Sequence, residues 1–209
     1  MQLEAKNIGF RYHQNPWLFR NFSLTLNSGE ILGLKGQSGC GKTTLARILA
    51  GYEKTLEGRI ELGGAPLPKV GYRAVQLVFQ HPEKSVNPRW HMRDILQEGW
   101  QPDDELLARF GIQQDWLSRW PNELSGGELQ RFCVVRALSP ETKFLIADEM
   151  TAMLDAITQA QIWQAILELA KERDLGILVV SHEKELVKRV CDRVIELDSV
   201  HLERNSFIS

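Results

Sequence analysis

Residues Gly36 to Thr43 read GQSGCGKT and fit the pattern GxxxxGK[ST]. The run before them, residues 30–35, is typical of a buried strand, and residues 44–50 after them are typical of a helix. A glycine-rich turn between a strand and a helix directs successive backbone N–H groups inward, with the positive end of the helix dipole behind them. The sequence therefore predicts an α/β fold with a phosphate-binding loop, in which Lys42 reaches the β- and γ-phosphates of a nucleotide and Thr43 ligates Mg²⁺. A glycine-rich loop that matches by chance is the alternative, and both flanking elements count against it.

Four short apolar runs have the near-continuous valine, isoleucine, leucine and phenylalanine content of strands that are covered on both faces. They are Ile31–Leu34, Val75–Phe79, Phe144–Ala147 and Ile177–Val180. A polar residue or loop follows each run at once. Because ligands of open α/β sheets bind outside the carboxyl ends of the strands, we expect these four endings to converge on one site.

The residues at these strand ends indicate hydrolysis of the bound nucleotide. We expect Asp148 to hold Mg²⁺ through its water shell and Glu149 to orient or deprotonate the attacking water. His182 is expected to contact the γ-phosphate, and Gln80 to reach the metal or the attacking water. Taken singly, paired acids after a strand more often begin a solvated loop, and a single histidine is more often structural. Their shared position beside a phosphate loop favours the functional interpretation.

A second glycine-containing helix start lies at Leu124 to Gln130, which reads LSGGELQ. Ser125 and Glu128 have the spacing of a capping box, which would explain the helix without any ligand. That explanation leaves Gly126 and Gly127 unaccounted for, since each glycine costs a helix roughly 1 kcal/mol relative to alanine. We expect phosphate to approach these bare amides. One nucleotide served by both cradles then requires a contorted monomer or two protomers arranged head to tail.

The composition is that of an ordinary globular protein, with 209 residues, 43% of them hydrophobic, and a formal net charge of −2. This length suffices for one sizeable core and a small inserted subdomain. Acidic and basic residues are interspersed, so we expect no nucleic-acid partner. No apolar run approaches the roughly 18 residues that span a bilayer, and the chain start lacks the plan of a signal peptide, so we expect a cytoplasmic protein.

Together these motifs resemble the ATP-binding cassette (ABC) family, over nearly the whole chain from Ala5 to about Leu197. GQSGCGKTT resembles the family's Walker A loop, FLIADE its Walker B strand and LSGGELQ its signature sequence, which is far more specific than Walker A. By the same resemblance Gln80 lies in the Q-loop, Asp155 in the D-loop and His182 at the switch histidine. Tyr12 falls where the family stacks an aromatic ring on adenine.

The resemblance implies ATP and Mg²⁺ as cofactors and three sets of site residues. The catalytic set is Glu149, His182 and Gln80. The Mg²⁺ ligands are Thr43, Gln80 and Asp148. The nucleotide contacts are Tyr12, Gly36, Gln37, Ser38, Gly39, Cys40, Gly41, Lys42, Thr43, Thr44, Ser125, Gly126, Gly127, Glu128 and Asp155.

The fold that the resemblance implies is α/β: a RecA-like P-loop NTPase core with an N-terminal antiparallel β region and an inserted α-helical subdomain. We expect one ABC ATPase domain over residues 1–209, with the nucleotide-binding core in residues 1–81 and 138–209 and the helical signature subdomain in residues 82–137. The insert holds two short amphipathic patterns, at Asp94–Trp100 and Asp103–Phe110. Trp116 and Trp120, spaced i,i+4, are expected in its core.

The segment after Gln80 narrows the resemblance to the ATPases of peptide and nickel importers. This segment faces the membrane subunits in the family, so we expect Asn87, Pro88, Arg89 and Trp90 to transmit motion to them. Longer members of that group carry a C-terminal extension. Few residues follow Leu197 here, so we expect the extension to be absent.

The loop after Glu149 departs from the family pattern. The family usually has Pro-Thr-Ser-Ala-Leu-Asp there, whereas this chain has Met-Thr-Ala-Met-Leu-Asp, with Met150, Ala152 and Met153 as the changed positions. This loop meets the opposite protomer in the family, so the changes affect the interface while the catalytic positions stay intact. A homodimer and a heterodimer with a related ATPase remain equal alternatives.

The leading hypothesis is the ATPase subunit of an importer for small peptides or for nickel or another chelated metal. Its expected partners are two membrane-spanning permease subunits, a second ATPase protomer and, indirectly, an external substrate-binding protein, and its expected place is the cytoplasmic side of the inner membrane. A soluble cassette ATPase acting on DNA or the ribosome is one alternative. Only 43 residues separate Gln80 from Leu124, no heptad array appears there and the chain has no internal repeat, which counts against this alternative. An exporter ATPase is the other, disfavoured by the segment after Gln80.

Overall fold

A parallel sheet forms the centre of the computed structural model, which describes residues 1–68 and 71–197. Its strand order is β6–β7–β8–β3–β9. The strands are β3 (Ile31–Lys35), β6 (Val75–Val78), β7 (Phe144–Asp148), β8 (Gly176–Val180) and β9 (Arg193–Glu196). The first four confirm the four predicted runs, and they lie side by side with all pairings parallel. The sequence pattern missed β9, because this edge strand is short and only its two central residues are apolar.

A second, antiparallel sheet has the order β2–β1–β4–β5. Its strands are β1 (Gln2–Phe10), β2 (Phe19–Asn27), β4 (Glu57–Leu62) and β5 (Ala65–Pro66). This sheet confirms the expected N-terminal antiparallel β region. The expectation about a C-terminal extension concerns residues 198–209 and lies outside the described residues.

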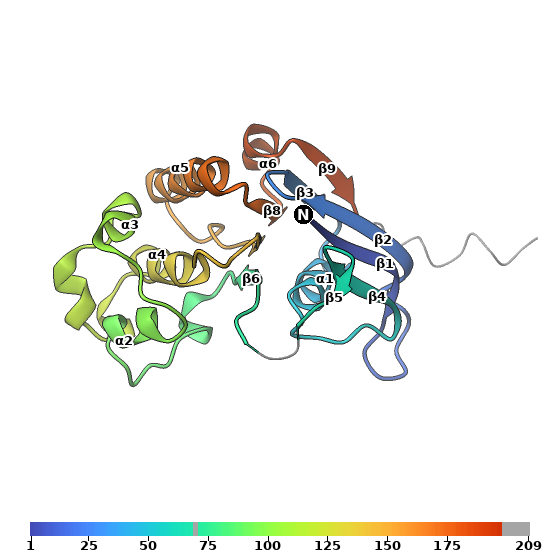
Figure 1. Cartoon of the computed structure of the whole chain (residues 1–209), viewed down its shortest axis with the longest axis horizontal. Coiled ribbons are helices and arrows are strands. Elements are labelled where there is room, and N and C mark those ends of the chain that lie inside the picture. The colour runs from blue at the N-terminus through green and yellow to red at the C-terminus, as the bar shows by residue number, and fades with distance from the viewer. Residues whose placement is uncertain (69–70, 198–209) are drawn as a thin grey trace, which may run out of the picture.

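The helices lie between and around the two sheets (Figure 1). They are α1 (Lys42–Leu49), α2 (Met92–Gln97), α3 (Asp104–Arg109), α4 (Gly126–Ala137), α5 (Ala156–Arg173) and α6 (Lys184–Val190). Single 3₁₀ turns occur at Pro82–Lys84, Gln114–Ser118 and Pro121–Glu123. Helices α2 and α3 lie at the end of the molecule away from β1, β2 and β4 (Figure 1).

The parallel sheet is covered on both faces, which explains its apolar sequence. Alternate residues of β7 show this: Phe144 and Ile146 pack in one cluster with α1 and the antiparallel sheet. Leu145 and Ala147 pack in the other cluster with α2 to α5. All five residues of β7 are buried, so the carboxyl end of this strand is held firmly where Asp148 ends it.

Between β6 and α4 the structure confirms the two amphipathic patterns and shows that one expectation, the burial of Trp120, is wrong. Helix α3 lies within its predicted stretch, and α2 begins two residues before its predicted stretch. Both helices bury their large apolar side chains. Trp116 packs against Phe132, with ring centroids 6.5 Å apart. The spacing predicts Trp120 beside it, but Trp120 is 39% exposed and stacks on His91 at 4.0 Å. The chain is extended at Arg119, so the two indoles do not share a helix face.

Candidate functional site

The loop between β3 and α1 adopts the conformation that its glycines allow. Gly41 is the N-cap of α1 and has a φ of 101°, in the left-handed region that side chains disfavour. Gly39 has a φ of 80°, and a Cβ added there would meet nothing within 4 Å. The backbone at Gly39 is therefore bare on its open side, as a loop that receives phosphate on its amides requires.

The ammonium group of Lys42 lies inside this loop. Its side chain donates hydrogen bonds to the carbonyl oxygens of Gly36 at 3.0 Å and Gln37 at 2.9 Å. Lys42 is only 5% exposed. The positive charge is thus held at the centre of the loop, where it adds to the field of the helix N-terminus.

A cavity of about 260 Å³ opens over the loop. Its lining comes from the β1–β2 connection, the β3–α1 loop, the start of α1 and the segments after β7 and β8, and consists of Tyr12, Leu18, Ser38, Gly39, Gly41, Lys42, Thr43, Thr44, Glu149 and His182. Tyr12 is 42% exposed, and its hydroxyl lies 3.1 Å from that of Thr44. This hydrogen bond ties the Tyr12 ring to the first turn of α1.

Asp148 and Thr43 offer oxygen ligands at the back of the loop. The Thr43 hydroxyl donates to a carboxylate oxygen of Asp148 at 3.3 Å. Burial raises the pKa of the Asp148 carboxyl, and the bond from Thr43 lowers it in part. Within residues 1–68 and 71–197 no group of three or more His, Cys, Asp or Glu side chains is placed to hold a metal. One carboxylate and one hydroxyl suit Mg²⁺, which commonly takes its other ligands from water and phosphate.

Glu149 and His182 meet at the mouth of the same cavity. The Nε2 atom of His182 lies 2.8 Å from a carboxylate oxygen of Glu149. Glu149 has a φ of 50°, which is strained for a residue with a side chain. Its backbone N–H donates to the carbonyl oxygen of Val180 at 2.9 Å, so the ends of β7 and β8 are joined at this point. The two predicted strand endings therefore do converge.

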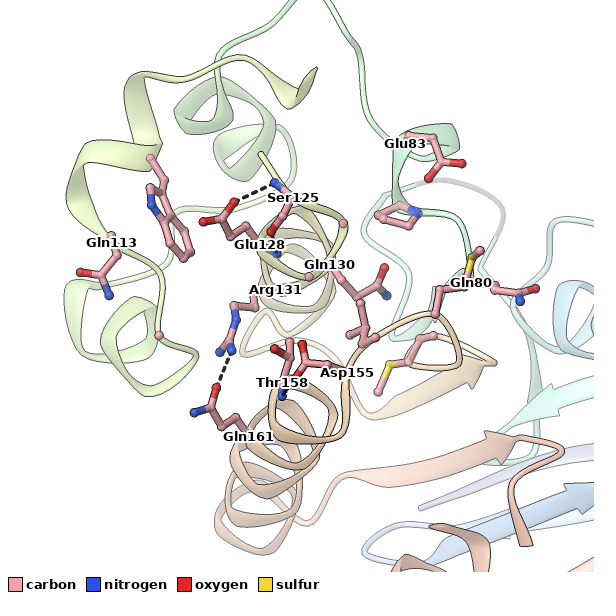
Figure 2. Close-up of a pocket in the computed structure, with 18 residues that line it drawn as sticks. Gln80, Glu83, Gln113, Ser125, Glu128, Gln130, Arg131, Asp155, Thr158 and Gln161 are labelled. Atoms are coloured by element: carbon pink, nitrogen blue, oxygen red, sulfur yellow. Dashed lines mark hydrogen bonds between the residues drawn. The ribbon is translucent and has the colours of Figure 1, made fainter. Parts of the chain in front are cut away.

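A second and larger cavity, of about 800 Å³, lies beside the start of α4 (Figure 2). The predicted capping box is present: Ser125 accepts from the N–H of Glu128 at 3.3 Å, and the Glu128 carboxylate accepts from the N–H of Ser125 at 2.7 Å. A Cβ at Gly126 would meet nothing within 4 Å, whereas one at Gly127 would lie 3.1 Å from the Thr158 side chain. The side-chain position of Gly126 is thus open, whereas that of Gly127 is filled by Thr158 of α5, and both glycines line the cavity.

The start of α5 forms the opposite wall of this cavity (Figure 2). The Asp155 carboxylate caps α5 by accepting from the N–H groups of Ile157 and Thr158, both at 3.0 Å. The pKa of Asp155 is lowered, mainly by the backbone hydrogen bond from Thr158. Met153 is 69% exposed on this wall, while Met150 is buried in the core.

Sequence reasoning missed Arg131, which ties three parts of this cavity together. Its guanidinium donates to the carbonyl oxygen of Phe110 at 2.7 Å and to the Gln161 side chain at 2.6 Å. Figure 2 shows Arg131 and Gln161 pointing toward each other between α4 and α5. Burial lowers the pKa of Arg131. The position of Arg131 directly after the signature residues was the only available signal.

Gln80 lies on the wall of the second cavity rather than among the described residues that line the first. The predicted site residues therefore fall into two groups on different surfaces. Tyr12, the loop, Asp148, Glu149 and His182 form one group. Gln80, Ser125, Gly126, Glu128 and Asp155 form the other, together with Gly127.

Comparison with known proteins decides the family. The model of the ABC transporter family matches residues 19–152. The chain belongs to the ABC transporter family. This cassette is an ATP-hydrolysing subunit of a transporter, and no helix in its described residues is long and apolar enough to cross a membrane.

Curated relatives and solved structures agree with this family. The nickel import ATP-binding protein NikE of Escherichia coli strain K12 is 38% identical, over 90% of this chain and 77% of that protein. The protein of the same name from Shigella sonnei gives the same values. The dimeric bacterial ABC transporter cassette MJ0796 shares the fold, with a TM-score of 0.79, 24% identity and 97% coverage of both chains. CbiO1 of Clostridium perfringens, part of the transporter complex cbiONQ, has a TM-score of 0.77 and 25% identity, covering 93% of this chain and 83% of that one.

Proposed function

We propose that this ABC ATPase powers an importer for nickel, another chelated metal or small peptides, from the cytoplasmic side of the inner membrane. The similarity to proteins named for nickel import supports the cargo class. In this proposal two membrane-spanning permease subunits carry the cargo, and an external substrate-binding protein delivers it to them.

The observation that carries the assignment of the site is the 2.8 Å contact between His182 and Glu149 in the cavity over the phosphate loop. We assign Glu149 as the base that orients or deprotonates the attacking water, because it is the carboxylate that lines this cavity. His182 holds Glu149 in place and contacts the γ-phosphate. Lys42 turns from the loop carbonyls to the β- and γ-phosphates, and Tyr12 stacks on adenine.

We assign the Mg²⁺ ligands to Thr43 and Asp148, with Gln80 joining them when the two cavities come together. The bound Mg²⁺ neutralises charge that develops on the phosphates. Burial raises the pKa of Asp148, because it disfavours the charged carboxylate. A cation bound beside this carboxylate would offset that effect and favour its charged form.

The separation of the predicted residues into two cavities supports a head-to-tail dimer. In such a dimer Ser125 and Gly126 of one protomer complete the ATP site of the other, and Asp155 and Met153 lie at the contact between them. The second protomer is a copy of this chain or a related ATPase. We further propose that residues 82–137 act as one inserted subdomain. The exposed Asn87, Pro88, Arg89 and Trp90 on it then meet the permease.

A Glu149→Gln variant tests the assignment of the site. We expect it to bind ATP with near-normal affinity and to lose at least about a hundredfold in turnover, because the amide cannot accept a proton from water. Isothermal calorimetry and phosphate release measure the two quantities. Glu141→Gln, at an exposed carboxylate that lines neither cavity, is the matched control and should turn over normally. Normal turnover by Glu149→Gln would remove Glu149 from this role.

The transport proposal is tested by affinity capture of tagged Glu149→Gln protein with ATP from solubilised native membranes. Recovery of two multi-span subunits supports the importer, and the binding protein that accompanies them identifies the cargo. Recovery of ribosomes or DNA-bound proteins in place of membrane subunits would overturn the proposal in favour of a soluble cassette ATPase.

A further inference from the structure

Thr151 is a buried polar residue in the loop that follows Glu149. It is 2% exposed, and its hydroxyl oxygen accepts two hydrogen bonds. One comes from the indole N–H of Trp163 and the other from the side-chain amide of Gln159, both at 3.1 Å. Because a buried hydroxyl needs such partners, α5 fixes the position of this loop through Thr151.

The same amide of Gln159 also holds the loop that follows β8. Its nitrogen lies 3.0 Å from each carboxylate oxygen of Glu183. A carboxylate only accepts hydrogen bonds, so the nitrogen of the Gln159 amide must face it. One N–H of the amide therefore serves Glu183 and the other serves Thr151, and both donors are used.

These two loops carry the pair that meets over the phosphate cavity. Glu149 precedes Thr151 by two residues, and its carbonyl oxygen accepts from the N–H of Ala152 at 3.1 Å. His182 directly precedes Glu183, whose N–H donates to the Ser181 hydroxyl at 3.1 Å. Gln159 is thus one side chain, on the long helix α5, that bonds to both loops within two residues of Glu149 and His182.

We propose that Gln159 is a positioning residue for ATP hydrolysis, setting Glu149 against His182 through its bonds to Thr151 and Glu183. The proposal rests on the roles assigned above to Glu149 and His182. The loop held by Thr151 continues to Met153 and Asp155 on the wall of the second cavity. A protomer that docks on this wall then moves a loop whose other end is the catalytic carboxylate. Displacements of about 1 Å at such a pair are enough to change turnover about a hundredfold.

Exchanging the amide of Gln159 with the carboxylate of Glu183 tests this positioning role. Gln159→Glu places a carboxylate against Glu183 and should lower kcat about tenfold, with the KM for ATP changed by less than about twofold. Glu183→Gln alone should lower kcat about two- to threefold. In the double variant the amide introduced at position 183 donates to the carboxylate introduced at position 159, and the Thr151 hydroxyl can rotate to donate to that carboxylate as well. We expect the double variant to recover to within about twofold of the original kcat.

Gln164→Glu is the matched control. Gln164 lies on the exposed side of the same helix and donates to Glu168 at 3.0 Å, so the substitution makes the same chemical change beside another carboxylate. It should leave kcat unchanged. Gln159→Met removes both hydrogen bonds without adding charge and should lower kcat about fivefold, which keeps the test informative if Gln159→Glu unfolds.

Recovery of kcat in the double variant with an unchanged KM supports the proposal when thermal unfolding shows that all variants stay folded at the assay temperature, since a purely structural role would lower Tm rather than the kcat of folded protein. Normal kcat in folded Gln159→Met or Gln159→Glu protein would overturn it. So would a double variant as slow as Gln159→Glu. If Glu149→Gln is inactive while the Gln159 variants are normal, only the positioning role fails and the site assignment stands.

Discussion

Lys42 carries a full charge at a position that is 5% exposed, and the loop satisfies this charge with two carbonyl oxygens. Carbonyl oxygens are weaker partners than phosphate oxygens, because a phosphate carries negative charge and adds an ionic attraction that a neutral carbonyl lacks. A bound phosphate would therefore give the Lys42 ammonium stronger hydrogen-bond partners than the two carbonyl oxygens of the loop. Gly36 has no room for a side chain, because an added Cβ would lie 2.6 Å from the carbonyl oxygen of Leu197 and 2.7 Å from the Sγ atom of the buried Cys40.

We expect Lys42→Ala to weaken ATP binding by at least about tenfold, because it removes the charge that phosphate would meet. Isothermal calorimetry with ATP measures the affinity. Lys54→Ala removes the same charge from an exposed position away from the cavity and is the control. Equal affinities for the original protein and Lys42→Ala would show that the ammonium does not contact the nucleotide.

Helix α5 connects most of the site, since its start, its first turns and its buried face touch different parts of it. Asp155 caps the helix, Gln159 bonds to two loops and Gln161 accepts from Arg131. Its packing face is buried through Ile162, Trp163 and the following turns. An element with these contacts moves as a unit, so its N-terminal cap matters for both stability and function.

The cap of α5 predicts a pH dependence of stability. The pKa of Asp155 is lower in the folded state, so its carboxylate stabilises the fold above the ordinary aspartate pKa, and this contribution is lost as pH falls through the lowered value. We expect Asp155→Ala to lower Tm by about 2–6 °C at pH 7, and Asp155→Asn to stay within about 2 °C because asparagine also caps helices. The advantage of the original protein over Asp155→Asn should begin to shrink below about pH 4 and should be lost once the pH is below the lowered pKa of Asp155. Thermal unfolding without nucleotide measures this, and a constant difference down to about pH 3 would contradict it.

The order of elements could be predicted better than the connections between them. The four strands of the sheet centre have unmistakable apolar runs, because they are buried on both faces. The edge strand β9 and the exposed Trp120 could not be found this way, since their environment depends on packing rather than on local pattern. The motifs likewise predicted that Glu149 and His182 belong to the candidate site. No spacing rule links Gln159 to Thr151 and Glu183, because only the fold brings these three residues together.

At the scale of the whole molecule, the two cavities are lined by different residues, and each holds only part of the predicted contacts. The second, larger cavity is lined by the start of α4 and the start of α5. Met153 is exposed on its wall, and Ile157 is exposed in the first turn of α5 just beyond it. Apolar side chains left in water beside an open helix N-terminus suit a surface that a second protomer covers.

A Ser125→Arg variant tests this arrangement. We expect it to bind ATP normally but to hydrolyse at least about a hundredfold more slowly, because the bulky cation blocks the cradle offered to the partner's ATP. In the Glu149→Gln background it should also prevent the ATP-dependent dimer seen by sedimentation. Ser118→Arg, at an exposed serine in a nearby 3₁₀ turn, is the control. Undiminished turnover by Ser125→Arg would exclude the head-to-tail dimer.

The indole of Trp163 is an intrinsic fluorescent probe of the loop after Glu149. It is 4% exposed, and its N–H is bonded to Thr151, two residues after Glu149. The emission of a buried indole depends on the hydrogen bond at its nitrogen and on the polarity around it. With the other tryptophans changed to phenylalanine, stopped-flow fluorescence would time the movement of the loop after Glu149 during each turnover, without any attached dye.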